Sequence, residues 1–233
     1  MGMSTENEVR DLFNRIASDY DRLNDVLSLG LHRIWKQMTV KWVNPAPGAV
    51  CLDVCCGSGD LAQILARRVG RHGQVYGLDF SAMLLTIAQQ RDVPSVHKAP
   101  IAWVEGDALA LSFPANTFDG VTMGYGLRNV TDVGQSLAEI LRVLKPGGRA
   151  AILDFCKAPD GCTQQFQQWY LHTLVVPIAT QLGLKAEYTY IEASLARFLM
   201  GSEQVALAQS LGFGQAKYYA IAANTMGILV LQK

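Results

Sequence analysis

The sequence predicts an α/β fold built on a mostly parallel sheet of about seven strands. Three observations predict it. Short apolar segments alternate with helical segments from Ala49 to Phe155, a glycine-rich turn from Asp53 to Gly59 follows the first of them, and two further β segments close the chain. With 233 residues, half of them hydrophobic, the chain is long enough for one such domain with a sizeable core.

The individual elements follow from the spacing of apolar residues and from turn residues. Residues from Asn7 to about Trp42 are expected to be helical, with a second helix over Leu31 to Trp42 and a break at Asn44 to Gly48. Strands are expected at 49–54, 74–79, 101–105, 118–123 and 149–155, and helices at 61–69, 81–91, 133–144, 163–183 and 202–211. An antiparallel hairpin of residues 216–223 and 226–231 then closes the sheet. We expect a single domain, 1–233, with a helical cap of residues 1–45 on a core of residues 46–233.

Charge and cysteine content restrict the partners. Lys plus Arg and Asp plus Glu number 20 each, so no basic surplus exists to bind a phosphate backbone, and no nucleic-acid partner is expected. The five cysteines have neither Cys-x-x-Cys spacing nor a histidine pair at zinc spacing, so no metal site is expected.

The N-terminus resembles neither a signal nor a transit peptide, and the longest apolar stretch, 171–184, is too short and too polar to span a bilayer. These features predict a cytoplasmic protein with reduced thiols.

The turn after the first strand is a candidate nucleotide site. Gly57 and Gly59 let a ligand approach the backbone without obstruction by Cβ, and the following helix offers free N–H groups. Asp79 ends the second strand 20 residues after Gly59, where a carboxylate can accept both ribose hydroxyls. Asp107 follows the third strand and can accept from an adenine amine. Taken singly, Asp79 would also suit an N-cap for the helix at Ser81.

Two cofactor classes compete for this site. The pattern Gly57-x-Gly59-x-x-Ala62 also fits the dinucleotide fingerprint of a nicotinamide dehydrogenase. Asp53, if it is not merely a solvated strand end, would place a carboxylate near that cofactor's pyrophosphate, whereas the ammonium and sulfonium of S-adenosyl-L-methionine suit a carboxylate. No Tyr-x-x-x-Lys pair occurs in the chain. We therefore expect a Rossmann-like S-adenosylmethionine methyltransferase fold whose cofactor-binding residues are Asp53, Cys55, Gly57, Ser58, Gly59, Asp79, Phe80, Met83, Asp107, Ala108 and Gly124.

Three stretches of the chain resemble one enzyme family. Residues Tyr20 to Ser28, with His32 and Trp35, are similar to the N-terminal signature of the UbiE/MenG quinone-biosynthesis C-methyltransferases, and residues 126–132 and 142–148 resemble two further motifs of that family. The resemblance covers the chain from about Val9 to Leu231. It implies methyl transfer to a ring carbon of a reduced, prenylated quinone. A lipid quinol substrate and peripheral contact with a thylakoid or plasma membrane follow from it, whereas the oligomeric state does not.

The chain departs from the family pattern at positions that narrow the substrate. The departures are Leu23 in place of Met, Cys55-Cys56 in place of a small Ala/Gly pair, Asp107 in place of Asn, Gly124 in place of Ser, and Asp154-Phe155-Cys156 in place of Glu-Phe-Ser. The Cys-Cys version of the loop resembles the phylloquinone branch, which methylates a phytyl-naphthoquinol (demethylphylloquinol to phylloquinol). The resemblance thus implies a reduced prenylated naphthoquinone. A benzoquinol, a soluble phenol, a sterol or another small acceptor stays open, as does a non-catalytic cofactor-binding role.

The motif of residues 126–132 also supplies candidate catalytic residues. A guanidinium with a pKa above about 12 cannot act as a base. Arg128 is therefore expected to stabilise the forming phenolate or to orient a water that takes the proton, and a structural ion pair is the alternative. Asn129 can hydrogen-bond the same oxygen.

Three further polar residues have two readings each. Tyr20 either closes over the methionine end of the cofactor or contacts the quinol; the alternative is a buried aromatic residue. His32 is a candidate base because it titrates near neutrality, although a packed histidine is the preferred interpretation. Asp154 either faces the acceptor or has a capping role. The apolar residues of 166–178 are expected to contribute to the core and to line a groove for the acceptor's tail.

Overall fold

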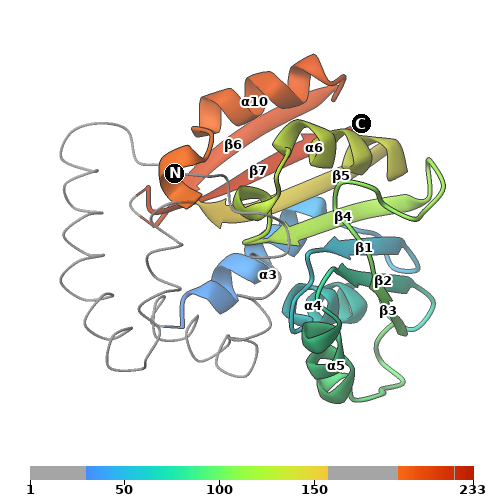
Figure 1. Cartoon of the computed structure of the whole chain (residues 1–233). Helices are drawn as coiled ribbons and strands as arrows, with labels where there is room; N and C mark the ends of the chain where they lie inside the picture. Colours follow the sequence, from blue (N-terminus) through green and yellow to red (C-terminus); the bar gives the residue numbers. More distant parts are fainter. Residues whose placement is uncertain (1–29, 157–193, 223) are drawn as a thin grey trace, which may run out of the picture.

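A seven-stranded sheet forms the centre of the computed structural model, which describes residues 30–156, 194–222 and 224–233 (Figure 1). The strand order is β3-β2-β1-β4-β5-β7-β6. The strands are β1 (Val50–Val54), β2 (Gln74–Asp79), β3 (Ile101–Glu105), β4 (Phe118–Gly124), β5 (Leu144–Phe155), β6 (Gln215–Ile221) and β7 (Met226–Gln232).

The strand directions confirm the predicted topology. Strands β1 to β5 pair in parallel, β7 runs antiparallel to β5, and β6 runs antiparallel to β7 as the predicted hairpin. Strand β1 lies between β2 and β4. The chain therefore adds β2 and β3 on one side of β1 and then returns to add β4 and β5 on the other side. In an open α/β sheet, ligands bind beyond the carboxyl ends of the strands at such a switch point.

Helices cover both faces of the sheet. They are α3 (His32–Val43), α4 (Asp60–Val69), α5 (Ala82–Arg91), α6 (Val133–Val143) and α10 (Gly201–Ser210). A short 3-10 helix, η1 (Leu127–Asn129), lies between β4 and α6. Figure 1 shows α6 and α10 in front of the sheet and α3 behind it. Helix α3 packs against α4 and against β5.

The core consists of apolar layers on the two faces of the sheet. Consecutive residues of β1 point to opposite faces: Leu52 joins the cluster that contains α6 and α10, whereas Cys51 packs with Leu65 of α4. Because both faces are covered, the strand is a continuous apolar run rather than an alternating one. A third cluster packs Val43 of α3 onto Leu153 of β5.

The start of β5 differs from the prediction. We expected a turn at 145–148 before a strand from Arg149, but the strand begins at Leu144. The register passes from Phe118↔Leu144 to Gly120↔Arg149, so four residues of β5 bulge opposite one residue of β4. The Gly147 N–H donates to the Lys233 carbonyl at 3.1 Å, and the Lys233 N–H donates to the Gly148 carbonyl at 3.1 Å. These bonds to a residue distant in sequence hold the segment in the sheet.

The remaining boundaries agree with the prediction to within one or two residues where the structure describes them. Side chains cap two of the helices: the Ser81 hydroxyl accepts the Leu84 N–H at 3.2 Å ahead of α5, and Asp132 accepts the Gln135 N–H at 2.9 Å ahead of α6. The predicted helical residues 7–29 and the predicted helix 163–183 lie outside the described residues, and so does Tyr20.

Candidate active site

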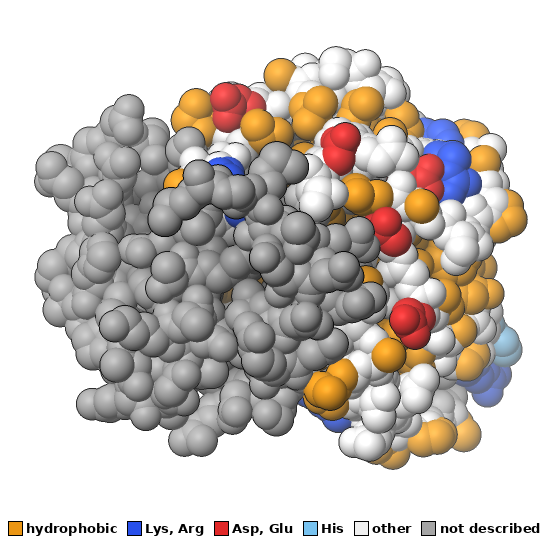
Figure 2. Space-filling view, in the orientation of Figure 1, with side chains coloured by type: hydrophobic (Ala, Val, Ile, Leu, Met, Phe, Trp, Pro, Cys, Tyr) orange, Lys and Arg blue, Asp and Glu red, His pale blue; other side chains and the backbone are white. Residues whose placement is uncertain are grey.

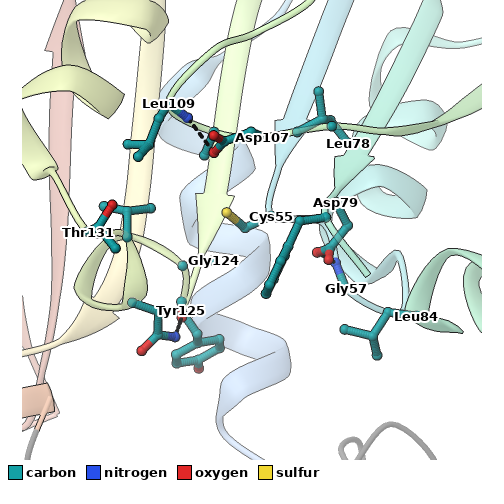
Figure 3. A pocket seen from close by; sticks show the side chains of 16 residues that line it. Cys55, Gly57, Leu78, Asp79, Leu84, Asp107, Leu109, Gly124, Tyr125 and Thr131 are labelled. Atoms are coloured by element: carbon teal, nitrogen blue, oxygen red, sulfur yellow. Dashed lines mark hydrogen bonds between the residues drawn. The ribbon is translucent and has the colours of Figure 1, made fainter. Parts of the chain in front are cut away.

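One pocket opens at the carboxyl ends of β1, β2, β3 and β4, at the predicted switch point (Figure 3). Figure 3 shows Leu78, Asp79 and Leu84 on one side of it and Thr131, Gly124 and Tyr125 on the other. Its lining comprises Cys55, Gly57, Leu78, Asp79, Phe80, Leu84, Gly106, Asp107, Ala108, Leu109, Gly124, Tyr125, Gly126, Asn129, Val130 and Thr131.

Asp79 is held at the pocket wall by backbone donors. Its carboxylate accepts the Gly57 N–H at 2.8 Å and the Ser81 N–H at 3.0 Å. Burial raises the pKa of this carboxyl to about 6, against the lowering effect of the backbone hydrogen bonds. An ionised carboxylate offers about four lone-pair positions, so acceptor capacity remains for a ligand. The geometry thus combines a fixed orientation with room for two hydroxyl donors.

Asp107 lies beyond the end of β3. One carboxylate oxygen accepts the Leu109 N–H at 2.8 Å, as the dashed line in Figure 3 marks. This short backbone loop orients the side chain. Gly106 beside it has no room for a side chain, because an added Cβ would lie 2.9 Å from a methyl carbon of Leu78. The tight turn therefore places Asp107 at the pocket.

Asp53 is buried behind the pocket rather than in its lining. It is 1% exposed, and its two oxygens accept the Thr122 hydroxyl at 2.7 Å and the Ala62 N–H at 3.0 Å. Burial raises its pKa to about 7. The side chain ties β1 to β4 and to the first turn of α4, where a negative charge is favourable. Direct contact with the methionine ammonium of the cofactor, as expected from the sequence, stays a prediction.

The glycine loop serves packing as well as ligand access. Gly57 and Gly59 have φ of +54° and +89°, and α4 begins directly after them. A Cβ on Gly59 would lie 2.5 Å from the Trp103 ring and 3.2 Å from the Cβ of Ala88. Gly59 therefore allows α4, β3 and α5 to approach one another, while Gly57 lines the pocket.

Cys55 occupies the middle of the pocket floor in a left-handed conformation with φ of +53° (Figure 3). Burial, with the neighbouring carboxylates Asp79, Asp53 and Asp107 adding to it, raises the pKa of the thiol well above its usual value. A thiol in that environment stays protonated and is not a nucleophile. A Cβ on Gly126 would lie 2.6 Å from the Cβ of Cys55, so this glycine makes space for the larger residue.

Arg128 lies beside the pocket in a buried ion pair. Its Nη1 donates to Asp154 Oδ1 at 2.6 Å and to the Tyr125 carbonyl at 3.1 Å, and both charged side chains are about nine-tenths buried or more. The Arg128 backbone N–H donates to the other oxygen of Asp154 at 3.0 Å, and the guanidinium stacks on the Phe155 ring at 4.8 Å. Its Nε is buried and has no hydrogen-bond partner among the described residues. The ion pair that was one of the two expectations for Arg128 is present.

Asn129 is the predicted catalytic residue that the structure does place in the lining. Its Nδ2 donates to the Tyr125 carbonyl at 2.9 Å, which orients the amide. Arg128 donates to the same carbonyl, so the two side chains share one anchor. Of the other candidates, His32 is a buried residue of α3, and Tyr20 lies outside the described residues.

Several predicted cofactor residues do not line the pocket. Ser58 and Gly59 belong to the glycine loop but are not part of the lining, and Met83 is 52% exposed on α5. Phe80, Ala108 and Gly124 do line it, as expected. Figure 3 shows that most of the wall is apolar side chain or backbone around two carboxylates.

Half of the lining is absent from the candidate site residues that the sequence supplied. These residues are Leu78, Leu84, Gly106, Leu109, Tyr125, Gly126, Val130 and Thr131, of which Gly126, Val130 and Thr131 lie in the motif of residues 126–132. Most adjoin a predicted residue in the chain, so proximity to Asp79, Asp107 and Asn129 was an available signal. Leu84 lies in the first turn of α5, and the packing of that helix brings it to the pocket. Within the described residues, no group of three or more His, Cys, Asp or Glu side chains could hold a metal ion.

Comparison with known proteins gives close relatives and distant structural neighbours. A family model described as the ubiE/COQ5 methyltransferase family matches residues 1–232. A Trichormus variabilis protein named 2-phytyl-1,4-naphtoquinone methyltransferase is 56% identical over 227 residues, covering 97% of this chain and 99% of the relative. An Arabidopsis thaliana protein named 2-phytyl-1,4-beta-naphthoquinone methyltransferase, chloroplastic, is 49% identical, covering 97% and 88%.

The solved structures confirm the predicted fold. A SAM-dependent methyltransferase from Thermotoga maritima superposes with a TM-score of 0.65 at 18% identity and covers 96% of this chain and 99% of its own. One from Aquifex aeolicus has a TM-score of 0.59 at 16% identity, covering 84% and 88%. The sheet and its helices are therefore those of the Rossmann-like methyltransferases.

Proposed function

Because the chain belongs to the ubiE/COQ5 methyltransferase family, we propose that it transfers a methyl group from S-adenosyl-L-methionine to a ring carbon of reduced 2-phytyl-1,4-naphthoquinone. Membership makes the chain a methyltransferase. The proposed substrate rests on one observation. Relatives that are named 2-phytyl-1,4-naphthoquinone methyltransferases are 49–56% identical to this chain over 97% of its length or more. The product is the corresponding methylated naphthoquinol, as in phylloquinone biosynthesis.

The pocket fits the nucleoside half of the cofactor. Asp79 keeps acceptor positions for the two ribose hydroxyls while two backbone N–H groups hold it, and Asp107 can accept from the exocyclic amine of adenine. Leu78 and Leu84 supply apolar contacts for the flat base. When bound, the cofactor supplies an electrophilic methyl group on a sulfonium. A cationic ligand would favour the ionised form of the buried Asp53 carboxyl, whose negative charge in turn suits the cationic end of the cofactor.

The acceptor is assigned to the side of the pocket formed by Tyr125, Asn129 and Thr131. Carbon methylation needs electron density on the ring, which a phenolate supplies, so a donor that stabilises the phenolate oxygen favours the reaction. Asn129 reaches the pocket and is the direct candidate. Arg128 is proposed to act indirectly, through the position of Asn129 and through its own charge, because both side chains donate hydrogen bonds to the Tyr125 carbonyl. Tyr20 remains a further candidate contact from the cap.

The lipid nature of the acceptor implies a visit to a membrane surface. No helix within the described residues is both long enough and apolar enough to cross a bilayer. We propose peripheral contact, at a thylakoid or plasma membrane. On the described part of the face in Figure 2, acidic and basic side chains are interspersed with hydrophobic ones, and no extended patch of one charge is visible.

A methyl-transfer assay tests this function. Labelled S-adenosyl-L-methionine is incubated with reduced and oxidised 2-phytyl-1,4-naphthoquinone, a prenylated benzoquinol and a soluble phenol. We expect label in the reduced phytyl-naphthoquinone above all others. Preferred transfer to the benzoquinol or the phenol would reassign the acceptor, and inactivity on every acceptor despite cofactor binding would favour a non-catalytic role.

A further inference from the structure

A second hollow lies on the sheet face that α3 covers, beyond the C-terminal end of that helix. Its residues come from α3, β5, β6 and β7 and include charged, amide and aromatic side chains. We call it the cationic groove, and its lining is Lys41, Trp42, Asn44, Arg149, Gln215, Lys217, Tyr219, Val230, Leu231 and Gln232.

The charge of this groove is of one sign. Lys41, Arg149 and Lys217 line it, and no Asp or Glu is part of its described lining. None of the three cations forms an ion pair or hydrogen bond with the described residues. An adjoining hollow, which Arg149 and Asn44 also line, contains the carboxylate of Asp119, which accepts hydrogen bonds from Lys145 Nζ at 2.7 Å and from the Val50 N–H at 2.8 Å. Among the described residues, three cationic side chains without an ion pair therefore line one groove, on a chain whose formal net charge is zero.

The sheet register places the polar side chains on the same face. Arg149 pairs with Gln232 of β7, and Gln232 pairs in turn with Gln215 of β6. Directly opposed residues point to the same side of a sheet, and so do residues two apart, which adds Lys217. Arg149 and Lys217 lie on the two strands that flank β7, and Lys217 is two positions along the strand from the residue directly opposite. The usual strand spacing and rise place the two Cα atoms roughly 12 Å apart. Two side chains of that length can reach one group bound between them, above the amide of Gln232.

The wall of the groove includes a pair of aromatic side chains. The Trp42 and Tyr219 rings meet edge to face with their centroids 4.0 Å apart, at the junction of α3 and β6. Lys41 stands in the last turn of α3, where a cation is also favourable for the helix itself. Arg149 and Lys217 are on strands and have no such role, so their charge is unexplained by the fold.

We propose that the cationic groove is a binding site for a tetrahedral oxyanion of the phosphate or sulfate class, held by Arg149, Lys217 and Lys41 with amide donors from Gln215 and Gln232. Guanidinium and ammonium donors form the strongest hydrogen bonds with such groups. The source of the oxyanion is either a free anion or the headgroup of an anionic lipid.

This site is separate from the methyl-transfer pocket. Arg149 is in register with Gly120 of β4, whereas the pocket begins at Gly124, four residues further along the strand. Four residues of a parallel strand span roughly 13 Å. The proposal therefore stands or falls independently of the proposed function.

Titration of the full chain with inorganic phosphate, at ionic strength held constant with chloride, tests the site by calorimetry. In a second arm, flotation with phosphatidylcholine vesicles is compared with flotation with mixed phosphatidylglycerol and phosphatidylcholine vesicles. Lys217→Glu and Arg149→Glu are the variants, and Arg67→Glu, an exposed position on α4, is the matched control for net charge. We expect each groove variant to weaken binding by about tenfold or more, and the control to weaken it by less than about twofold.

The outcomes separate the sources. Binding of phosphate together with binding to the anionic vesicles assigns a lipid headgroup, and binding of phosphate alone assigns a free anion. Either outcome supports the site if the groove variants lose that binding. The proposal is overturned if neither ligand binds, or if the groove variants bind as the control does. Unchanged thermal unfolding of the variants shows that they are folded.

Discussion

Arg128 of η1 and Asp154, near the end of β5, form a buried ion pair with 2.6 Å between Arg128 Nη1 and Asp154 Oδ1. The second carboxylate oxygen accepts the backbone N–H of the same arginine. One aspartate thus fixes both the side chain and the main chain of Arg128. Asn129, the next residue, lines the pocket, so the ion pair sets the position of a candidate acceptor contact.

Asp154→Asn should lower both stability and turnover. The substitution leaves the Arg128 charge buried without a counter-charge, which costs roughly 3–5 kcal/mol of unfolding free energy. Urea unfolding measures this loss. The double variant Arg128→Met/Asp154→Leu should recover part of the stability, because no buried charge remains, but not the turnover. A double variant with full turnover would assign the pair a structural role only.

Arg128→Ala should reduce methyl transfer more than it reduces cofactor affinity. If Arg128 stabilises the phenolate through its field, kcat should fall by roughly 100-fold or more, as for loss of an oxyanion donor. Affinity for S-adenosylhomocysteine, measured by calorimetry, should change by less than about threefold, because Arg128 does not line the pocket. The reverse pattern would place Arg128 in the cofactor site.

Gly59→Ala should destabilise the protein through the packing of Trp103. The new Cβ would lie 2.5 Å from that ring, and φ of +89° is strained for alanine. Overpacking of this kind costs about 1–3 kcal/mol. Because Trp103→Phe removes the ring atoms involved, the double variant should lose less stability than the two single variants added together. Strict additivity in chemical denaturation would contradict the contact.

The sequence was sufficient for the fold and for the carboxylates of the pocket, because strand ends are readable from apolar runs that stop at polar residues. Asp79 and Asp107 were found in this way, and both line the pocket. The direction of a side chain is not readable in the same way. Asp53 ends up on Thr122 and Ala62, residues that only the assembled sheet and helix bring to it.

The same reason explains the other differences. The partner of Arg128 lies 26 residues further along the chain, on a strand whose register is set by the bulge in β5. The glycine at position 59 was interpreted as access for a ligand, but its neighbours Trp103 and Ala88 come from two later elements. Local patterns predict which backbone forms, and long-range packing decides what each side chain meets.

Asp79→Ala should abolish cofactor binding. The carboxylate is the one group in the lining of β2 that can accept ribose hydroxyls, and a loss of two hydrogen bonds to a charged acceptor corresponds to roughly 3 kcal/mol or more, about 100-fold in affinity. Calorimetry with S-adenosylhomocysteine measures this. Gln90→Ala, at an exposed position of α5 outside the lining, is the control and should bind normally. Unchanged affinity of the Asp79 variant would refute the ribose assignment.

Cofactor affinity should fall as the pH falls through about 6, the value to which burial raises the pKa of Asp79. Only the ionised carboxylate accepts from both hydroxyls, so below that pH the affinity should decrease by up to about tenfold per unit. The stability of the unliganded protein should change with pH in the opposite direction to the cofactor affinity. A carboxyl with a raised pKa adds stability that is fully present below its unfolded value of 3.8 and is lost as the pH rises through about 6 for Asp79 and about 7 for Asp53. Calorimetric titrations at pH 5, 6, 7 and 8 measure the affinity, and Asp79→Asn should bind weakly but with a flat pH profile. If the variant keeps the wild-type slope, another group controls the titration.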